Sequence, residues 1–159
     1  MMKKNNEPLT YEQAKEKALR LLEFRSHSEK ELRDKLRRAG AERDDIDAIL
    51  DFCREYAFVN DAEFARRKAA DLKKLKKYGK KRIQNELYVL GISADIMEEV
   101  LSEMDFEDEG EQLYPLVQRK LGGDFDRKSK DRCIRYFLYR GYDFYDIKRC
   151  MEQAEAEEE

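Results

Sequence analysis

A glycine follows a helix-like segment three times in this chain, at a nearly constant interval. Gly40, Gly91 and Gly141 close the segments ELRDKLRRAG, RIQNELYVLG and RCIRYFLYRG, and they lie 51 and 50 residues apart. A period near 50 residues that recurs across a chain is an internal repeat. At a matching distance after each glycine, an apolar residue opens a new amphipathic segment: Ile46, Ile96 and Ile147. We therefore expect three copies of one small unit.

Each repeat is predicted to contain three helices. Apolar residues recur every three or four positions in three stretches of the first repeat, and the later repeats show the same pattern. Two prolines and seven glycines in 159 residues are too few for a turn-rich β fold. We predict an all-α protein of three tandem three-helix repeats that form an elongated, curved body. The predicted domains are 1–58, which includes an N-terminal extension, 59–104, and 105–159, which includes an acidic tail.

Capping residues indicate where several helices begin and end. Thr10 with Gln13, and Ser28 with Glu31, fit a capping box, in which the hydroxyl accepts an amide hydrogen bond and the later side chain returns to the cap. The three repeated glycines stand where a left-handed residue is needed to end a helix. Further N-cap candidates are Asn60 or Asp61, Ser93 and Asp143.

Pro115 conflicts with the helical pattern, because a helix from about Glu109 to Leu121 would carry it in the interior. Proline has no N–H, and its ring clashes with the preceding turn of a helix. The helix is therefore expected either to start near Tyr114 or to bend at the proline.

The composition excludes several kinds of site. The chain has one histidine, His27, which we place in the loop before the Ser28 cap, and three scattered cysteines, so neither a histidine-based zinc site nor a CxxC pair can form. We predict no metal, no cofactor and no disulfide framework, which favours a reducing cytoplasm. No apolar run approaches the roughly 18 to 20 residues that cross a bilayer, so we expect no membrane contact. No coherent catalytic set stands out, and we expect no enzyme.

Charge is segregated along the chain, although the formal net charge is only -3. The segment Asp61–Leu90 carries ten basic and four acidic residues, and Arg119–Arg149 carries ten against five. In contrast, Glu98–Glu111 holds eight acids and no base, and Glu152–Glu159 adds five acids. The basic regions are typical of a surface that binds phosphates or an acidic protein. A solvated helix face lined with lysine and arginine explains them equally well.

Two basic clusters are the candidate binding residues. Seven cations within ten positions form the first, and six in the last repeat form the second. Lysine supplies a point charge and arginine a fork of donors that fits phosphate or carboxylate. The first basic cluster is Lys73, Lys74, Lys76, Lys77, Lys80, Lys81 and Arg82; the second basic cluster is Arg127, Lys128, Lys130, Arg132, Arg135 and Arg140.

Aromatic residues crowd the last repeat, where they alternate with arginines. One interpretation is stacking on exposed nucleic-acid bases. The interpretation we favour is a core role for Phe137 and some of the tyrosines, because a very small bundle needs large side chains to fill its interior. The residues concerned are Tyr136, Phe137, Tyr139, Tyr142, Phe144 and Tyr145.

Four segments, taken together and in order, resemble the RecX family of bacterial regulatory proteins. The resemblance extends from about Leu9 to Met151. Its motifs are an Arg-Ser turn before Glu-Leu, an Asn-Asp before Phe-Ala, a glycine before basic residues and Leu-x-x-x-Gly, and a final Arg-Gly-aromatic. The segments are FRSHSEKELRDKL at Phe24–Leu36, YAFVNDAEFARRKA at Tyr56–Ala69, YGKKRIQNELYVLGI at Tyr78–Ile92 and RYFLYRGYDFYDI at Arg135–Ile147.

The resemblance implies tandem three-helix repeats that bind the RecA recombinase filament in its helical groove. It also implies that the protein lowers RecA's ATP hydrolysis, strand exchange and co-protease action on the SOS repressor, and so acts in recombination, DNA repair and the SOS response. Three features depart from the family pattern: Pro115, the acidic end after Met151, and Tyr56-Ala57-Phe58, where a Gly-aromatic turn is common.

Two function classes remain open from the sequence. The first is a monomeric regulator that binds the RecA filament through the two basic clusters, with contact to single- or double-stranded DNA left open. The alternative is a helical-repeat DNA-binding module that acts directly on DNA through helix pairs like a helix-turn-helix. No helix carries the Arg, Asn and Gln set expected for reading bases, which favours the first class.

Overall fold

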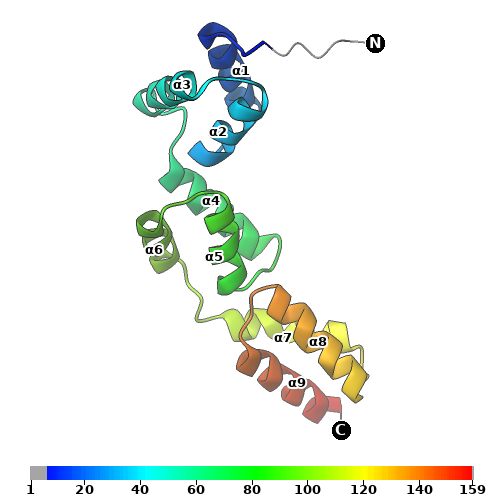
Figure 1. Ribbon diagram of the computed structural model, residues 1–159. Coiled ribbons are helices and arrows are strands. Elements are labelled where there is room, and N and C mark those ends of the chain that lie inside the picture. The colour runs from blue at the N-terminus through cyan, green and yellow to red at the C-terminus, as the bar shows by residue number, and fades with distance from the viewer. Residues whose placement is uncertain (1–6, 159) are drawn as a thin grey trace, which may run out of the picture. The chain divides into compact units, whose positions relative to one another are not determined.

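The computed structural model describes residues 7–158, and within that range it contains only α-helices and the loops that join them (Figure 1). This confirms the predicted all-α fold. Nine helices lie in the described range: α1 (Tyr11–Phe24), α2 (Glu29–Arg38), α3 (Arg43–Glu55), α4 (Asp61–Lys74), α5 (Lys80–Val89), α6 (Ala94–Glu103), α7 (Glu109–Leu121), α8 (Arg127–Tyr139) and α9 (Phe144–Glu158).

The repeated glycines end the second helix of each group of three. Their φ angles are +99° at Gly40, +82° at Gly91 and +95° at Gly141, in the left-handed region that side chains with a Cβ avoid. The next helix begins a few residues later in each case. The predicted left-handed helix ends are therefore confirmed at all three positions.

The predicted N-caps are also present. Thr10 and Ser28 both form complete capping boxes with Gln13 and Glu31. Asn60 caps α4 by accepting from the Glu63 N–H at 3.1 Å. The other two predicted caps accept hydrogen bonds from the first turns of α6 and α9, at 3.3 Å for Ser93 and 2.9 Å for Asp143.

Pro115 lies inside α7, which begins six positions earlier at Glu109. The expectation that this helix would start near Tyr114 is wrong. Leu113, Val117 and Leu121 of α7 are all buried, and the packing of this apolar face offsets the hydrogen bond that proline cannot make.

The chain divides into two compact units, and the division passes through α4, α5 and α6. Within the described range, unit 1 comprises residues 7–67 and 88–97, and unit 2 comprises residues 68–87 and 98–158. The first and last groups of three helices therefore belong wholly to unit 1 and unit 2 respectively.

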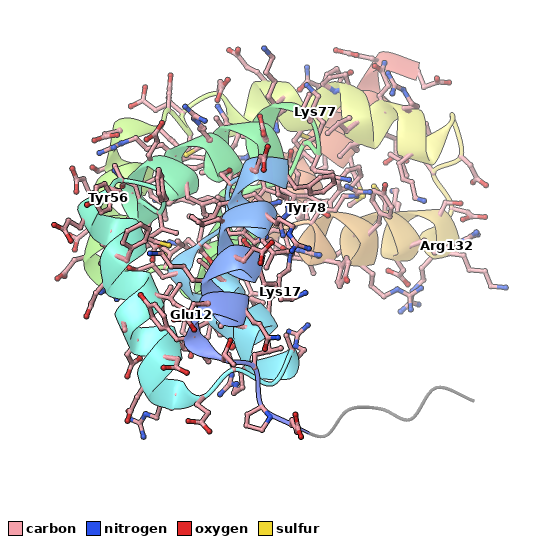
Figure 2. All side chains as sticks on the ribbon, turned by 90° about the horizontal axis from the view of Figure 1, so that it is seen from above. Glu12, Lys17, Tyr56, Lys77, Tyr78 and Arg132 are labelled. Carbon is pink, nitrogen blue, oxygen red and sulfur yellow. The ribbon has the colours of Figure 1, made fainter. Side chains whose placement is uncertain are left out.

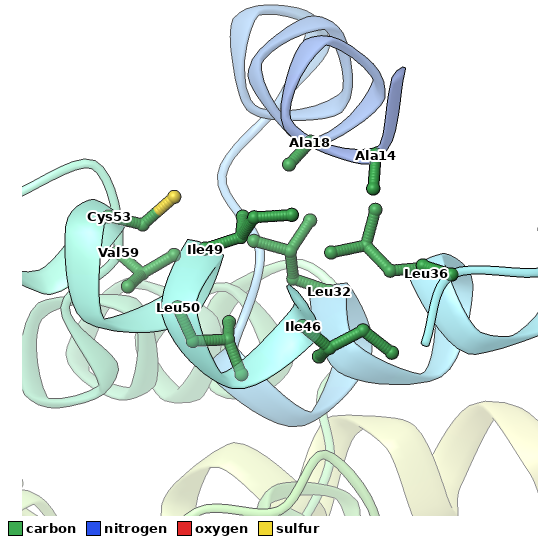
Figure 3. Close-up of a cluster of buried hydrophobic side chains, with 10 residues drawn as sticks. Ala14, Ala18, Leu32, Leu36, Ile46, Ile49, Leu50, Cys53 and Val59 are labelled. Carbon is green, nitrogen blue, oxygen red and sulfur yellow. The ribbon is translucent and has the colours of Figure 1, made fainter. Parts of the chain in front are cut away.

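The core of unit 1 is formed by α1, α2 and α3 (Figure 3). Figure 3 shows Ala14 and Ala18 of α1 facing leucine and isoleucine side chains of the other two helices. Both alanines are fully buried, and their small size lets α1 approach closely. The other labelled core residues are Leu32, Leu36, Ile46, Ile49, Leu50, Cys53 and Val59.

His27 lies in the loop before α2, as predicted, but its side chain is buried. One ring nitrogen, Nδ1, lies 2.9 Å from the Arg25 carbonyl oxygen, and Nε2 lies 2.8 Å from Nζ of Lys35. A carbonyl can only accept and an ammonium can only donate, so Nδ1 carries the proton and Nε2 accepts. Burial lowers the pKa of His27, and this geometry selects the neutral ring.

The core of unit 2 is formed by α7, α8 and α9 and includes two of the six aromatic residues from the last repeat. Phe137 and Tyr142 are buried, as the core interpretation requires. The other four aromatic side chains are exposed at the surface. They are Tyr136, Tyr139, Phe144 and Tyr145.

The repeat period has a structural cause, which is visible inside each unit. In unit 1, Ser28 Oγ donates to the Leu90 carbonyl at 2.7 Å, and a Cβ at Gly91 would lie 2.4 Å from Cβ of Lys30. The N-terminus of the second helix in one repeat therefore contacts the glycine that ends the second helix of the next repeat.

Unit 2 contains the same junction one repeat later. The Gly79 N–H donates to the Arg140 carbonyl at 2.8 Å. A Cβ at Gly79 would lie 2.5 Å from the Gly141 carbonyl oxygen, and a Cβ at Gly141 would lie 2.2 Å from the Arg82 backbone nitrogen. Only glycine allows the two backbones to come this close.

Candidate functional site

The loop between α4 and α5 is held against the end of α8 by hydrogen bonds to its carbonyl groups. The Tyr142 hydroxyl donates to the Lys77 carbonyl at 2.5 Å, and the Arg140 guanidinium donates to the Lys76 carbonyl at 3.3 Å. Lys77 has a φ of +58°, which is unusual for a residue with a side chain. These bonds therefore position the lysine-rich loop in a specific conformation.

Arginine and tyrosine side chains interleave beside this loop. The Arg82 guanidinium lies 4.8 Å from the Tyr78 ring centre and 4.5 Å from that of Tyr139. The Arg140 guanidinium lies 5.6 Å from the Tyr78 ring and 4.7 Å from the Tyr136 ring. At these distances a cation over the face of an aromatic ring makes a favourable cation–π interaction. We call these five residues the arginine–tyrosine cluster.

Arg82 is fixed more firmly than an ordinary surface arginine. Its Nε donates to Glu86 at 2.9 Å, and its Nη1 donates to the Tyr139 carbonyl at 3.0 Å. The hydrogen bond to Glu86 is the main cause that raises the pKa of Arg82. Arg82 therefore acts mainly as a bridge within unit 2.

A pocket of about 390 Å³ opens next to the arginine–tyrosine cluster. It is bordered by the α4–α5 loop, the C-terminal part of α7 and the C-terminal part of α8. Five of its residues are cationic, and none of its lining residues is acidic. The lining residues are Lys76, Lys77, Leu116, Arg119, Lys120, Tyr136, Phe137 and Arg140.

The structure divides the first basic cluster into engaged and available cations. Lys73 donates to the Asp105 carbonyl and to Asp108, at 2.6 and 3.0 Å, and its side chain is only 19% exposed. Arg82 is engaged as described above. The remaining five members are exposed, and within residues 7–158 none of their ammonium groups pairs with a carboxylate: Lys74, Lys76, Lys77, Lys80 and Lys81.

The second basic cluster is spread along α8, whose 13 residues extend over about 20 Å. Its first four members, Arg127, Lys128, Lys130 and Arg132, lie in the first two turns, and Arg135 lies in the middle. Only Arg140 contacts the lysine-rich loop. Figure 2 shows Arg132 apart from Lys77 and Tyr78. Lys130 is paired with Glu155 at 2.8 Å.

The site also contains residues that belong to neither predicted basic cluster: Tyr78, Leu116, Arg119, Lys120, Tyr136, Phe137 and Tyr139. Arg119 and Lys120 are adjacent cations in the last turn of α7, and they stand at the start of the basic stretch Arg119–Arg149. This signal could have included them. The sequence does not show that Tyr136 is exposed, and nothing in it assigns Tyr78 to a surface shared with α8.

The described residues offer no group of three or more His, Cys, Asp or Glu side chains that could hold a metal ion. All three cysteines are buried, and burial raises the pKa of the Cys133 thiol to about 11, which makes it a poor nucleophile. None of the helices in residues 7–158 has the length and apolar character needed to cross a membrane. The surface around the pocket is equipped to bind anions.

Two sequence models of known protein domains match the chain. The model described as "RecX, first three-helix domain" matches residues 14–53, and the model described as "RecX, second three-helix domain" matches residues 60–101. Together they cover just over half of the 159 residues.

Whole-chain relatives agree with the domain models. "Regulatory protein RecX" of Clostridium botulinum (strain Eklund 17B / Type B) is 34% identical over an alignment of 145 residues, which covers 88% of this chain and 68% of the relative. "Regulatory protein RecX" of Cronobacter sakazakii (strain ATCC BAA-894) is 33% identical over an alignment of 150 residues, which covers 87% of this chain and 90% of the relative. These names describe regulatory proteins and no enzyme.

The fold also matches a solved structure. The crystal structure of RecX from Lactobacillus salivarius superimposes with a TM-score of 0.75, covering 92% of this chain and 97% of the other, at 21% identity. At that identity the match establishes the helical fold. The two domain models and the relatives that are about one-third identical also establish the family: the chain belongs to the RecX family of regulatory proteins.

Proposed function

We propose that this chain binds the RecA–DNA filament and lowers the activities of RecA, namely ATP hydrolysis, strand exchange and co-protease action. It would thereby regulate recombination, DNA repair and the SOS response as a cytoplasmic monomer. The protein acts by occupying a surface of the filament, where it obstructs subunit movement and partner access. No chemical step is carried out by the chain itself.

The observation that carries this proposal is the set of five exposed lysines around the α4–α5 loop, none of which pairs with a carboxylate in the described residues. Such a set attracts acidic side chains or DNA phosphates and accelerates encounter with a negatively charged filament. Membership of the RecX family supplies the regulatory role. The partner, RecA, comes from the resemblance described above.

The test is direct binding to RecA filaments on single-stranded DNA, measured by co-sedimentation. Lys74→Glu combined with Lys81→Glu reverses two exposed charges that do not line the pocket. We expect this variant to bind filaments about tenfold more weakly or worse, because two attractive contacts become repulsive. The matched control is Lys17→Glu combined with Arg43→Glu, which makes the same charge change at exposed positions of unit 1.

The control should bind within about twofold of the unmodified chain, and circular dichroism should show equal helicity for all three proteins. If the loop variant and the control bind the filament equally well, the loop is not the contact surface.

A second candidate is direct action on DNA, and the arginine–tyrosine cluster favours it, because exposed tyrosines and arginines can stack on bases. It predicts tight binding to DNA without RecA, with a steep dependence on salt. Fluorescence anisotropy with labelled single- and double-stranded oligonucleotides distinguishes the two candidates. The RecA proposal requires the filament to bind far better than DNA alone.

A further inference from the structure

The pocket beside the α4–α5 loop contains an unusual concentration of positive charge. Lys76, Lys77, Arg119, Lys120 and Arg140 all line it, together with no acidic residue. Within residues 7–158 none of these five cations forms an ion pair with a carboxylate. Like charges that share a concave surface repel one another and raise the local concentration of anions. The pocket therefore suits a ligand with several negative charges.

One side of the pocket is apolar. Leu116 and Phe137 lie beside Tyr136, a residue that is 38% exposed. The Lys120 ammonium lies 4.2 Å from the centre of this ring and the Arg140 guanidinium 4.7 Å from it. An apolar wall next to the cations suits a ligand that joins a ring system to its negative charges. A simple inorganic anion would leave this wall uncovered.

The size and rigidity of the pocket are suited to binding a small molecule. Its volume of about 390 Å³ falls in the range of small-ligand pockets, roughly 300 to 1,000 Å³. The Tyr142 hydroxyl holds the backbone of Lys77 through its carbonyl, and the Lys76 carbonyl holds the Arg140 guanidinium. A preformed pocket loses little conformational entropy when a ligand binds.

We propose that this pocket binds a nucleoside triphosphate, with the phosphates among the five cations and the base against the wall formed by Leu116, Tyr136 and Phe137. A triphosphate carries about four negative charges at neutral pH. A nucleotide within a DNA strand carries only one, so the number of cations favours the free triphosphate. This binding needs no RecA, and it goes beyond the proposed regulatory function.

The test uses the full chain alone in isothermal titration calorimetry with four probes: ATP, inorganic tripolyphosphate, adenosine and a short oligo(dT) strand. ATP should bind more tightly than tripolyphosphate, because only ATP also covers the apolar wall. Adenosine should show no measurable binding, because it lacks the charges. Failure of ATP to bind at millimolar concentration overturns the proposal, as does oligo(dT) binding at the pocket that excess ATP does not displace.

A pair of matched variants locates the site. Arg119→Gln combined with Lys120→Gln removes two adjacent cations that line the pocket, whereas Arg127→Gln combined with Lys128→Gln removes an identical pair at the start of α8, outside it. We expect the first pair to weaken ATP binding about tenfold or more, the factor expected for lost charged hydrogen bonds, and the second pair to change it less than about twofold. Equal effects of the two pairs overturn the assignment to this pocket.

The outcome is separable from that of the filament experiment. Lys74 and Lys81, which are replaced in the filament-binding test, do not line the pocket. Arg119 and Lys120 do not belong to either predicted basic cluster. If the Arg119→Gln, Lys120→Gln variant loses ATP binding and retains filament binding, the result supports ATP binding at the pocket independently of the filament proposal. Unchanged ATP binding in that variant overturns the pocket and leaves the filament proposal standing.

Discussion

Ala57 shows how one residue can store strain in a turn. It follows α3 with a φ of +57°, in the left-handed region, and its side chain is exposed. An L-residue other than glycine loses roughly 1 to 2 kcal/mol there relative to a right-handed conformation. The sequence already singled out this position, because the RecX pattern commonly has a glycine before the aromatic residue.

Replacing Ala57 with glycine should stabilise the protein by about 0.5 to 1 kcal/mol, since relief of strain exceeds the added flexibility of the unfolded chain. Urea unfolding should show a higher midpoint with an unchanged slope. The control is Ala62→Gly in the first turn of α4, where the same change should lower the midpoint. A lower midpoint for both variants would show that Ala57 is not strained.

His27 makes the stability of unit 1 dependent on pH. Burial lowers its pKa in the folded protein below the ordinary value of 6.5. Below pH 6.5 the unfolded chain therefore takes up a proton that the folded chain still resists. Stability from this group is fully present above pH 6.5 and is lost as the pH falls toward the lower pKa of the folded state.

The expected result is a larger loss of unfolding free energy between pH 7.5 and pH 5.5 in the unmodified chain than in His27→Gln, which cannot take up a proton. Urea unfolding at the two pH values measures the difference, and the comparison removes the contribution of carboxyl groups common to both proteins. Equal losses in the two proteins would show that His27 does not titrate as described.

At the scale of helices, the repeated glycine is both an end signal and a contact point. Gly141 combines a φ of +95° with a close approach to the Arg82 backbone, whereas Gly110 of α7 has open space where a Cβ would be. Gly141→Ala should therefore cost more than about 2 kcal/mol, through strain and a clash. Gly110→Ala should instead stabilise by about 0.5 to 1 kcal/mol, because alanine favours helix.

Chemical denaturation of both glycine variants measures these effects. If Gly141→Ala were as stable as the unmodified chain, the junction between the α4–α5 loop and the end of α8 would not be as tight as described. Gly141→Ala should also weaken ATP binding at the pocket, since this junction positions Lys76 and Lys77.

The helices were predictable because their signals are local. A capping box spans four residues, and an apolar stripe repeats within one helix, so Thr10, Ser28 and Gly40 could be assigned without knowledge of the fold. Pro115 was harder, because the packing that keeps it inside α7 involves α8 and α9. Which aromatic residues of the last repeat lie in the core could not be predicted, since spacing alone does not show which side of α8 the neighbouring helices cover.

The site was predictable only in part, because its residues come from distant parts of the sequence. Tyr78 and Arg140 lie 5.6 Å apart, measured from ring centre to guanidinium, although 62 positions separate them in the chain. The charge count identified a lysine-rich segment but could not reveal that Asp108 engages Lys73. Both facts depend on the junction between repeats.

For the molecule as a whole, the formal net charge of -3 conceals the fact that positive charge is concentrated in one region. Acidic residues neutralise the edges of the basic region, where Asp108 pairs with Lys73 and Glu155 pairs with Lys130. The lysines of the α4–α5 loop are left available. An anionic partner is therefore attracted to a limited part of the surface of unit 2.

The central claim is that this chain regulates RecA by binding the filament. The most direct measurement is the rate of ATP hydrolysis by RecA on single-stranded DNA, titrated with the full chain and with the Lys74→Glu, Lys81→Glu variant. We predict inhibition by the unmodified chain and a concentration for half-inhibition about tenfold higher for the variant. Undiminished ATP hydrolysis at saturating concentrations of the unmodified chain would contradict the claim.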